Sequence, residues 1–161
     1  MAKSAAERAE LVQLEDGTEV TVRQIGPADA PALIRSHTAL SDDARRRRFF
    51  SPHPVLSEKE AQFFAAVDHT DREAFVVLHD DVVVGVGRYD RLEPTVAEVA
   101  FVVGDEWQSH GIATLLLRRL ADRAVEVGIT RFVAETMGDN QAMITVFKHW
   151  APDRKVTYDS G

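Results

Sequence analysis

The sequence predicts a mixed α/β fold of one domain, with a sheet that is antiparallel early in the chain and parallel where a helix crosses over. Three consecutive β-branched runs between residues 73 and 103 are typical of a meander. A helical pattern at 111–128 is followed by a strand pattern at 131–136, as a crossover requires. With 161 residues, 45% of them hydrophobic, the chain can bury one core.

The N-terminal segment 1–12 is rich in Ala, Glu and Arg, so we expect a frayed helix or a disordered lead-in there. The domain proper is expected at 13–161. Asp16-Gly17 predicts a turn. The alternation in "TEVTVRQI" (18–25) then predicts the first strand.

Helical signals come next in the chain. Pro27 suits the first turn of a helix that should run to about Leu40. A capping serine and acidic residues at the start of 41–50 are consistent with another short helix. Ser57 and Glu60 form a capping-box pattern, which predicts a helix at about 58–67.

Strands dominate the middle of the chain. "EAFVVLH" and "VVVGVGRYD" are joined by Asp80-Asp81 in the pattern of a tight hairpin, and "AEVAFVV" should be the third strand of the meander. The helix at 111–128 should close at Gly128, and a helix at 140–150 and a strand at 154–159 should follow the strand at 131–136. The main elements therefore follow the order β-α-α-β-β-β-α-β-α-β.

Composition excludes several classes of protein. The net charge of −7 provides no basic surface for nucleic acid. The absence of cysteine excludes disulfides, cysteine-ligated zinc and a cysteine nucleophile, and the six histidines show no metal-ligand spacing. No signal peptide is visible and no apolar run reaches the length of a membrane helix, so a cytoplasmic protein is expected.

The segment "FVVGDEWQSHGIATLLL" (101–117) carries the strongest functional signal. A helix N-terminus presents unpaired N–H groups and the positive end of the helix dipole, which suits a phosphate. Gly111 permits unusual dihedrals and Ala113 leaves only a methyl group, so a diphosphate can approach the backbone. The alternative interpretation is a glycine in an ordinary strand–helix loop, followed by a good helix former.

The spacing Gln108-x-x-Gly111-x-Ala113, between a strand and an amphipathic helix, resembles the acetyl-CoA-binding motif of the GNAT N-acetyltransferase superfamily. The order of elements also matches the GNAT (acyl-CoA N-acyltransferase) fold. "NQAMITVFKHW" (140–150) is similar to the segment in which GNAT proteins often carry an asparagine and, seven residues on, a tyrosine. The resemblance covers about residues 18–160 and implies acetyl-CoA as the co-substrate, with no metal.

A narrower resemblance is to the acetyltransferase domain of bacterial Pat-type protein-lysine acetyltransferases. It rests on "LSDDARRRRFFSPHPVLSEKE", "VGRYDRL" and "AEVAFVV". The resemblance implies acetylation of a lysine side chain in a protein, such as an acyl-CoA synthetase. Pat-type domains often adjoin a cyclic-nucleotide-binding domain or an acyl-CoA-synthetase-like region, for which this chain has no room. Regulation by such a partner is therefore expected to be absent or supplied in trans.

Glu98 is the candidate general base. On a strand it shares a face with Ala100 and Val102. A carboxylate inside an apolar strand is costly unless it is solvated or useful, and transfer to an amine requires a base because a free lysine is protonated. The resemblance to Pat-type domains points to the same residue. The alternative is an exposed glutamate opposite Arg88 or another cation.

The resemblance implies the cofactor contacts as well. The backbone of 101–103 should pair with the pantetheine arm as an added strand would, and one N–H there should polarise the thioester carbonyl. The N–H groups of about 109–114 should hold the diphosphate, while His110 either contacts the phosphates or faces solvent. The predicted cofactor-binding residues are Phe101, Val102, Val103, Gln108, Ser109, His110, Gly111, Ile112, Ala113, Thr114, Asn140 and Phe147.

The sequence also provides candidate residues for the acceptor side of the site. Tyr89, Phe50 and His53 are the candidates, with core packing as the alternative for Tyr89 and Phe50. Phe147 stands where the usual tyrosine would protonate the leaving thiolate, which weakens that step without abolishing transfer. The final strand of the usual fold is apparently missing, which leaves an edge open or filled by a second subunit in a homodimer.

Two other functions stay open. Acetylation of a small amine would be favoured by a deep acidic pocket rather than an open groove. A non-catalytic module that senses acetyl-CoA would be consistent with Phe147 and the shortened C-terminus. The expected partner is a protein substrate with an acceptor lysine, and neither nucleic acid nor a membrane.

Overall fold

The computed structural model describes residues 9–38, 56–108 and 110–133, which form a six-stranded sheet in the order β1-β2-β3-β4-β5-β6. The strands are Glu10–Gln13 (β1), Glu19–Gln24 (β2), Arg72–His79 (β3), Val82–Glu93 (β4), Val96–Val103 (β5) and Arg131–Val133 (β6). Neighbouring strands pair antiparallel except β5 and β6, which are parallel. The mixed α/β sheet predicted from the sequence is confirmed.

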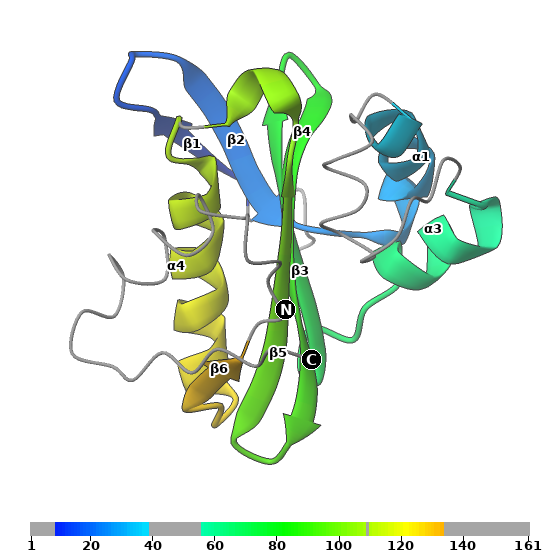
Figure 1. Ribbon diagram of the computed structural model, residues 1–161, viewed down its shortest axis with the longest axis vertical. Coiled ribbons are helices and arrows are strands. Elements are labelled where there is room, and N and C mark those ends of the chain that lie inside the picture. The colour runs from blue at the N-terminus through cyan, green and yellow to red at the C-terminus, as the bar shows by residue number, and fades with distance from the viewer. Residues whose placement is uncertain (1–8, 39–55, 109, 134–161) are drawn as a thin grey trace, which may run out of the picture.

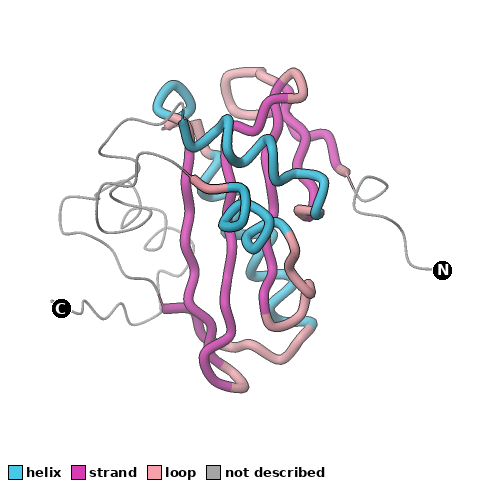
Figure 2. Tube along the Cα trace, turned by 90° about the vertical axis from the view of Figure 1, so that its right-hand side faces the viewer, coloured by secondary structure: helices cyan, strands magenta, loops and turns pink. Residues whose placement is uncertain are grey.

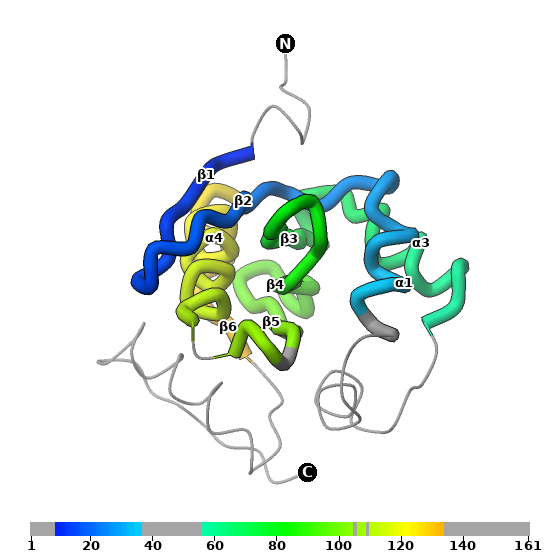
Figure 3. The backbone as a smooth tube through the Cα atoms, turned by 90° about the horizontal axis from the view of Figure 1, so that it is seen from above, coloured from blue at the N-terminus to red at the C-terminus, as the bar shows by residue number. Residues whose placement is uncertain are grey.

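Helices cover both faces of this sheet (Figures 1 and 3). On one face lies α4 (Ile112–Glu126). On the other face lie the short 3₁₀ helix η2 (Pro27–Asp29), α1 (Ala30–Thr38) and α3 (Glu58–Ala65). In Figure 2 the long strands extend side by side from one end of the molecule to the other. The sheet therefore separates two layers, each with its own core.

Strand β1 corrects the expectation for the N-terminal segment. The sequence predicts a frayed helix or a disordered lead-in at 1–12, yet Glu10–Gln13 pairs with β2. The predicted turn at Asp16-Gly17 is confirmed, because Asp16 Oδ1 accepts a hydrogen bond from Thr18 N at 2.9 Å and Gly17 has φ of 92°. A strand of 4 residues is too short to show a clear alternation, so only its pairing with β2 reveals it.

Helix α4 matches the pattern at 111–128. The side chains that it buries recur at helical spacing: Ile112, Leu116, Leu117, Leu120 and Ala124. Its C-terminus is a Schellman motif, because Ile129 N donates to Ala124 O at 2.9 Å and Gly128 N donates to Val125 O at 3.3 Å. The predicted stop at Gly128 is confirmed by its φ of 85°.

The alternation of β5 divides its side chains between the two layers. Ala97 and Val99 are buried against α4 with Leu120 and Ala124. On the opposite face, Ala74 and Val76 of β3 pack against α1 and α3 through Leu33 and Ala61. Glu98 lies on this second face because it alternates with Ala97 and Val99.

Helix α3 begins as its sequence predicts. Ser57 Oγ accepts a hydrogen bond from Glu60 N, and the Glu60 carboxylate accepts one from Ser57 N, each at 3.1 Å. The predicted helices at 41–50 and 140–150, the strand at 154–159 and the question of a missing final strand lie outside the described residues. Within the described ranges, no helix is long and apolar enough to span a bilayer.

Candidate functional site

The connection from β5 to α4 is built from backbone hydrogen bonds. Gly104 N donates to Val84 O at 2.9 Å, which ties the end of β5 to β4. Trp107 N donates to Gly104 O at 2.8 Å and closes the short 3₁₀ helix η3 (Asp105–Trp107). The first backbone hydrogen bond of α4 runs from Leu115 N to Gly111 O at 3.0 Å. The preceding amides of α4 lie in its first turn, where a helix has no carbonyl of its own to offer them.

Gly111 is the N-cap of α4 and has a left-handed backbone, with φ of 86° and ψ of 6°. A Cβ at this position would have no heavy atom within 4 Å, so backbone conformation rather than space requires glycine here. The unusual dihedral expected at Gly111 is confirmed. The open space around a Cβ at Gly111, among the described residues, is compatible with a diphosphate at the start of α4. The contact itself stays a prediction.

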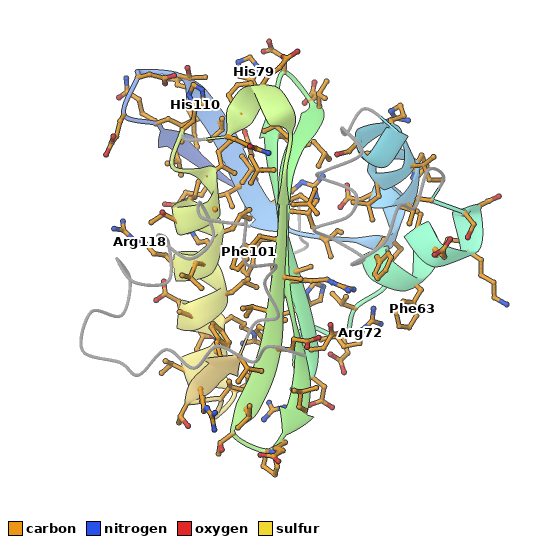
Figure 4. All side chains as sticks on the ribbon, in the orientation of Figure 1. Phe63, Arg72, His79, Phe101, His110 and Arg118 are labelled. Carbon is orange, nitrogen blue, oxygen red and sulfur yellow. The ribbon has the colours of Figure 1, made fainter. Side chains whose placement is uncertain are left out.

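His110 has a partner that neither sequence interpretation included. Its Nδ1 lies 3.1 Å from Asp16 Oδ2, in the β1–β2 turn. Hydrogen bonds from Thr18, and then His110, hold the pKa of Asp16 below its ordinary value. His110 also lies beside the Trp107 ring, which in turn lies 4.8 Å from the His79 ring. Figure 4 shows His79 and His110 at the same end of the molecule as the start of α4. An anion bound there would approach the carboxylate of Asp16.

The face of the sheet that carries Glu98 has a regular arrangement of side chains. Strand register places three rows across β3, β4 and β5: Arg72–Asp90–Glu98, Ala74–Arg88–Ala100 and Val76–Val86–Val102. The first row is charged, the second has an arginine between two alanines, and the third is apolar. We call Arg72, Arg88, Asp90 and Glu98 the acceptor face.

The two arginines of the acceptor face also hold α3. Arg72 Nε lies 3.4 Å from Asp90 Oδ1, and its guanidinium lies 3.9 Å from the centre of the Phe63 ring. The guanidinium of Arg88 lies 4.3 Å from the centre of the Phe64 ring. Figure 4 shows Phe63 and Arg72 on the side of the sheet that α3 covers. These cation–π contacts hold α3 against β3 and β4.

Tyr89 does not belong to the acceptor face, contrary to one prediction. It is directly opposite Val99 in the register, is fully buried, and packs against α4. Its hydroxyl donates to Thr70 O at 3.1 Å, and burial raises its pKa to about 12. The physical reason is the alternation of β4, which sends residue 89 to the opposite face from Arg88 and Asp90. The packing alternative is therefore correct.

A second buried carboxylate lies on the α4 face. Glu73 is fully buried; it accepts a hydrogen bond from Gln24 Nε2 at 2.8 Å, and its Oε1 lies 2.6 Å from His69 Nδ1. Arg123 Nε of α4 is 3.5 Å from its other oxygen. These partners satisfy Glu73 and join β3 to α4, so we assign it a structural role. The sequence analysis did not single it out.

The structure describes only some of the other predicted site residues. Strand β5 pairs with β6 at Val96, Ala97 and Glu98, and no β6 pairing is described for 101–103 within the described residues. Figure 4 shows Phe101 between the sheet and α4. Ser109, Asn140, Phe147, Phe50 and His53 are also outside the described residues. No cluster of His, Asp or Glu suited to a metal ion occurs in the part that the structure describes.

Comparison with known proteins identifies the family. The model of the acetyltransferase (GNAT) family matches residues 39–150. The chain belongs to this family. It is 32% identical to the acetyltransferase Pat of Mycolicibacterium smegmatis over 139 residues, which cover 82% of this chain and 40% of that protein. The GNAT domain of S. lividans PAT has 34% identity and a TM-score of 0.89, covering 99% of this chain and 96% of that chain.

These relatives confirm the GNAT fold and the resemblance to Pat-type domains. A cAMP-binding acyltransferase from Mycobacterium smegmatis has 29% identity and a TM-score of 0.63, covering 90% of this chain and 45% of that chain. The chain thus spans less than half the length of both M. smegmatis proteins. RimL, a ribosomal protein acetyltransferase solved with coenzyme A, has 19% identity and a TM-score of 0.67, covering 87% of this chain and 82% of that chain, which shows the shared fold alone.

Proposed function

We propose that this GNAT protein transfers an acetyl group from acetyl-CoA to a lysine side chain of a protein, with Glu98 as the general base. The observation that carries the proposal is the left-handed Gly111 at the start of α4, in the connection that follows the strand bearing Glu98. Bound acetyl-CoA supplies the activated acetyl group. The chain supplies a phosphate-binding helix N-terminus and a carboxylate on one continuous segment.

The start of α4 suits the phosphates of CoA. Ile112, Ala113 and Thr114 lie in the first turn, where their amides and the helix dipole favour an anion. Gly111 has no side chain, and apart from its chain neighbours no described group lies within 4 Å of where a Cβ would be. Each backbone amide can donate one hydrogen bond to a phosphate oxygen.

Glu98 suits the proton transfer. It is half-buried on the acceptor face, which is the side of the sheet opposite α4. A lysine amine has an ordinary pKa of about 10.4, so it is protonated at neutral pH and cannot attack until a base takes its proton. In the proposed reaction a Glu98 carboxylate oxygen accepts that proton, directly or through one water molecule.

The substrate class rests on the relatives. The GNAT domain of S. lividans PAT aligns with nearly the whole chain, and the curated relative from M. smegmatis is also a Pat acetyltransferase. Position 98 is half-buried on the sheet face opposite α4. The proposal also includes a cytoplasmic location and a homodimer. Both rest on the sequence expectations alone.

The test is incubation of the purified chain with labelled acetyl-CoA and a native cell lysate. Label should enter protein, and Glu98→Gln should lower the rate of CoA release by about 10²- to 10⁴-fold, the usual contribution of a general base. Glu93→Gln is the matched control, because Glu93 is exposed at the end of β4 and the charge change is the same.

Three results would contradict the proposal. Transfer to small amines but not to proteins would indicate a small-amine acetyltransferase. Tight binding of acetyl-CoA by calorimetry, with no CoA release from any amine, would indicate a sensing module. Equal rates for Glu98→Gln and Glu93→Gln would remove Glu98 from the mechanism.

A further inference from the structure

We propose that Arg88 is a positioning residue for the acetyl transfer: its guanidinium holds Glu98 in the carboxylate form and disfavours the protonated form of the acceptor amine beside it. The inference rests on the proposed function, because it acts through Glu98. It adds a residue that neither the family match nor the motif around Gly111 points to.

The geometry comes from strand register. Asp90 is directly opposite Glu98, and Arg88 is one step along the same face, between Ala74 and Ala100. Diagonal neighbours on one face of a sheet are within reach of a long side chain. The flanking alanines are too short to separate Arg88 from either carboxylate. The acceptor face thus places Arg88 diagonal to Glu98 and two residues from Asp90 on the same strand.

Arg88 is held in this place by its surroundings. Its guanidinium stacks on Phe64, and it is largely shielded from water, so burial lowers its pKa while Asp90 and Glu98 oppose that change. Within the described residues, its buried Nε has no hydrogen-bond partner. An arginine remains charged in proteins, so the guanidinium of Arg88 is a permanent cation beside Glu98. Its buried Nε–H can still donate a hydrogen bond.

This cation favours the reaction in two ways, which reinforce one another. A positive charge stabilises the carboxylate of Glu98, so the pKa of that carboxyl falls and the base is ready at lower pH. The same charge destabilises an ammonium group placed next to Glu98, which lowers the pKa of the amine and favours its neutral, nucleophilic form. Removal of Arg88 should therefore shift the acidic limb of the pH–rate profile to higher pH.

Among the residues that the structure describes, the other charges that face this site do not replace Arg88. Arg72 is engaged with Asp90, and Arg23 of β2 is held by Asp29 with two hydrogen bonds of 2.8 Å. On the packed helices the charged residues are Arg35 of α1 and Glu58, Lys59 and Glu60 of α3. Of these, Arg35, Glu58 and Lys59 are exposed, and Glu60 caps its own helix. The pKa of Arg88 responds to the charges of Asp90, Arg72 and Glu98.

The experiment measures the titration of the Glu98 carboxyl by carbon NMR with labelled glutamate, together with the pH profile of kcat/KM. Arg88→Met keeps a long side chain on Phe64 and removes the charge, and Arg88→Gln is a second neutral variant if the first does not fold. Arg88→Lys keeps the charge. Arg118→Gln is the matched control, because Arg118 is exposed on α4, away from the acceptor face (Figure 4).

The neutral variants should raise the Glu98 pKa, and the acidic limb of kcat/KM, by about 1 pH unit. Arg88→Lys and Arg118→Gln should stay near the wild-type values. Equal shifts in Arg118→Gln, no shift in the neutral variants, or a shift in Arg88→Lys as large as theirs would overturn the inference. The NMR titration needs no turnover, so a shifted Glu98 without acetyl transfer would contradict the proposed function and leave the role of Arg88 toward Glu98 supported.

Discussion

Gly85 of β4 lies directly beneath Ile112, the first residue of α4. A Cβ at position 85 would fall 2.7 Å from Ile112 Cγ2, closer than non-bonded carbons approach. Ile112 is fully buried, so it has little room to move. The absence of a side chain at Gly85 therefore sets how near the start of α4, and its free amides, can lie to the sheet.

Gly85→Val should displace the start of α4. Overpacking of this kind costs about 1–3 kcal/mol in the free energy of unfolding, and the displaced amides should bind acetyl-CoA more weakly. Urea denaturation and calorimetry would measure both effects. Gly26→Val is the control, since a Cβ there meets nothing within 4 Å and its φ of −136° suits a β-branched residue. Unchanged acetyl-CoA affinity in Gly85→Val would show that this contact does not position the site.

Gly111→Ala and Gly128→Ala form a matched pair. Both glycines flank α4, with φ of 86° and 85°, and a Cβ would meet nothing within 4 Å at either one. Each substitution should cost about 1–2 kcal/mol of stability, the price of a left-handed conformation for alanine. Only Gly111→Ala should also weaken acetyl-CoA binding in calorimetry. Equal loss of affinity in both variants would mean that helix stability, and not the N-terminal amides, governs binding.

Tyr89→Phe should leave acetyl transfer nearly unchanged. The variant loses the hydrogen bond to Thr70 O, worth about 1 kcal/mol, and keeps the packed ring. Because folding raises the pKa of Tyr89 from about 10 to about 12, the folded state favours the neutral phenol. That stabilisation is present below pH 10 and is lost as pH rises toward 12, so the wild type should lose stability in this range more steeply than the variant. A several-fold change in the KM for the acceptor would contradict this prediction and place Tyr89 in the acceptor site.

Asp29 should make the free energy of unfolding depend on pH in the acidic range. Burial raises its pKa, but hydrogen bonds from Arg23 and from Gly26 N outweigh burial and hold it below its ordinary value. The stabilisation is therefore present above about pH 4 and is lost as pH falls through the lower, folded pKa. Asp29→Asn should reduce the free energy of unfolding at pH 7, with the difference from wild type shrinking toward pH 2. Asp122→Asn on exposed α4 is the control, and an identical pH dependence of wild type and Asp29→Asn would contradict this assignment.

Local sequence signals predicted much of the fold. The capping box at Ser57 and the stop at Gly128 depend on residues within one helical turn. The left-handed Gly111 and the burial face of α4 are also local, since both follow from short spacings along the chain. The assignment to GNAT combined the motif at 108–113 with the order of elements and the segment 140–150, and the family match agrees with it.

Other features could not be read from the sequence, because they join residues far apart in the chain. The contact between His110 and Asp16 needs the β1–β2 turn to lie beside the start of α4. The burial of Tyr89 away from Glu98, and the alignment of Asp90 with Glu98, require the register of β4 against β5. A shift of one residue would exchange the two faces of β4.

The amino-acid sequence by itself determined most of the described helices and strands and the left-handed glycine at the start of α4, because those properties depend on the periodicity and conformational freedom of neighbouring residues. Only the tertiary structure decided which side chains share a face with Glu98. Backbone pairing between strands, with helices packed on both faces, selects one register among several that the same local pattern allows.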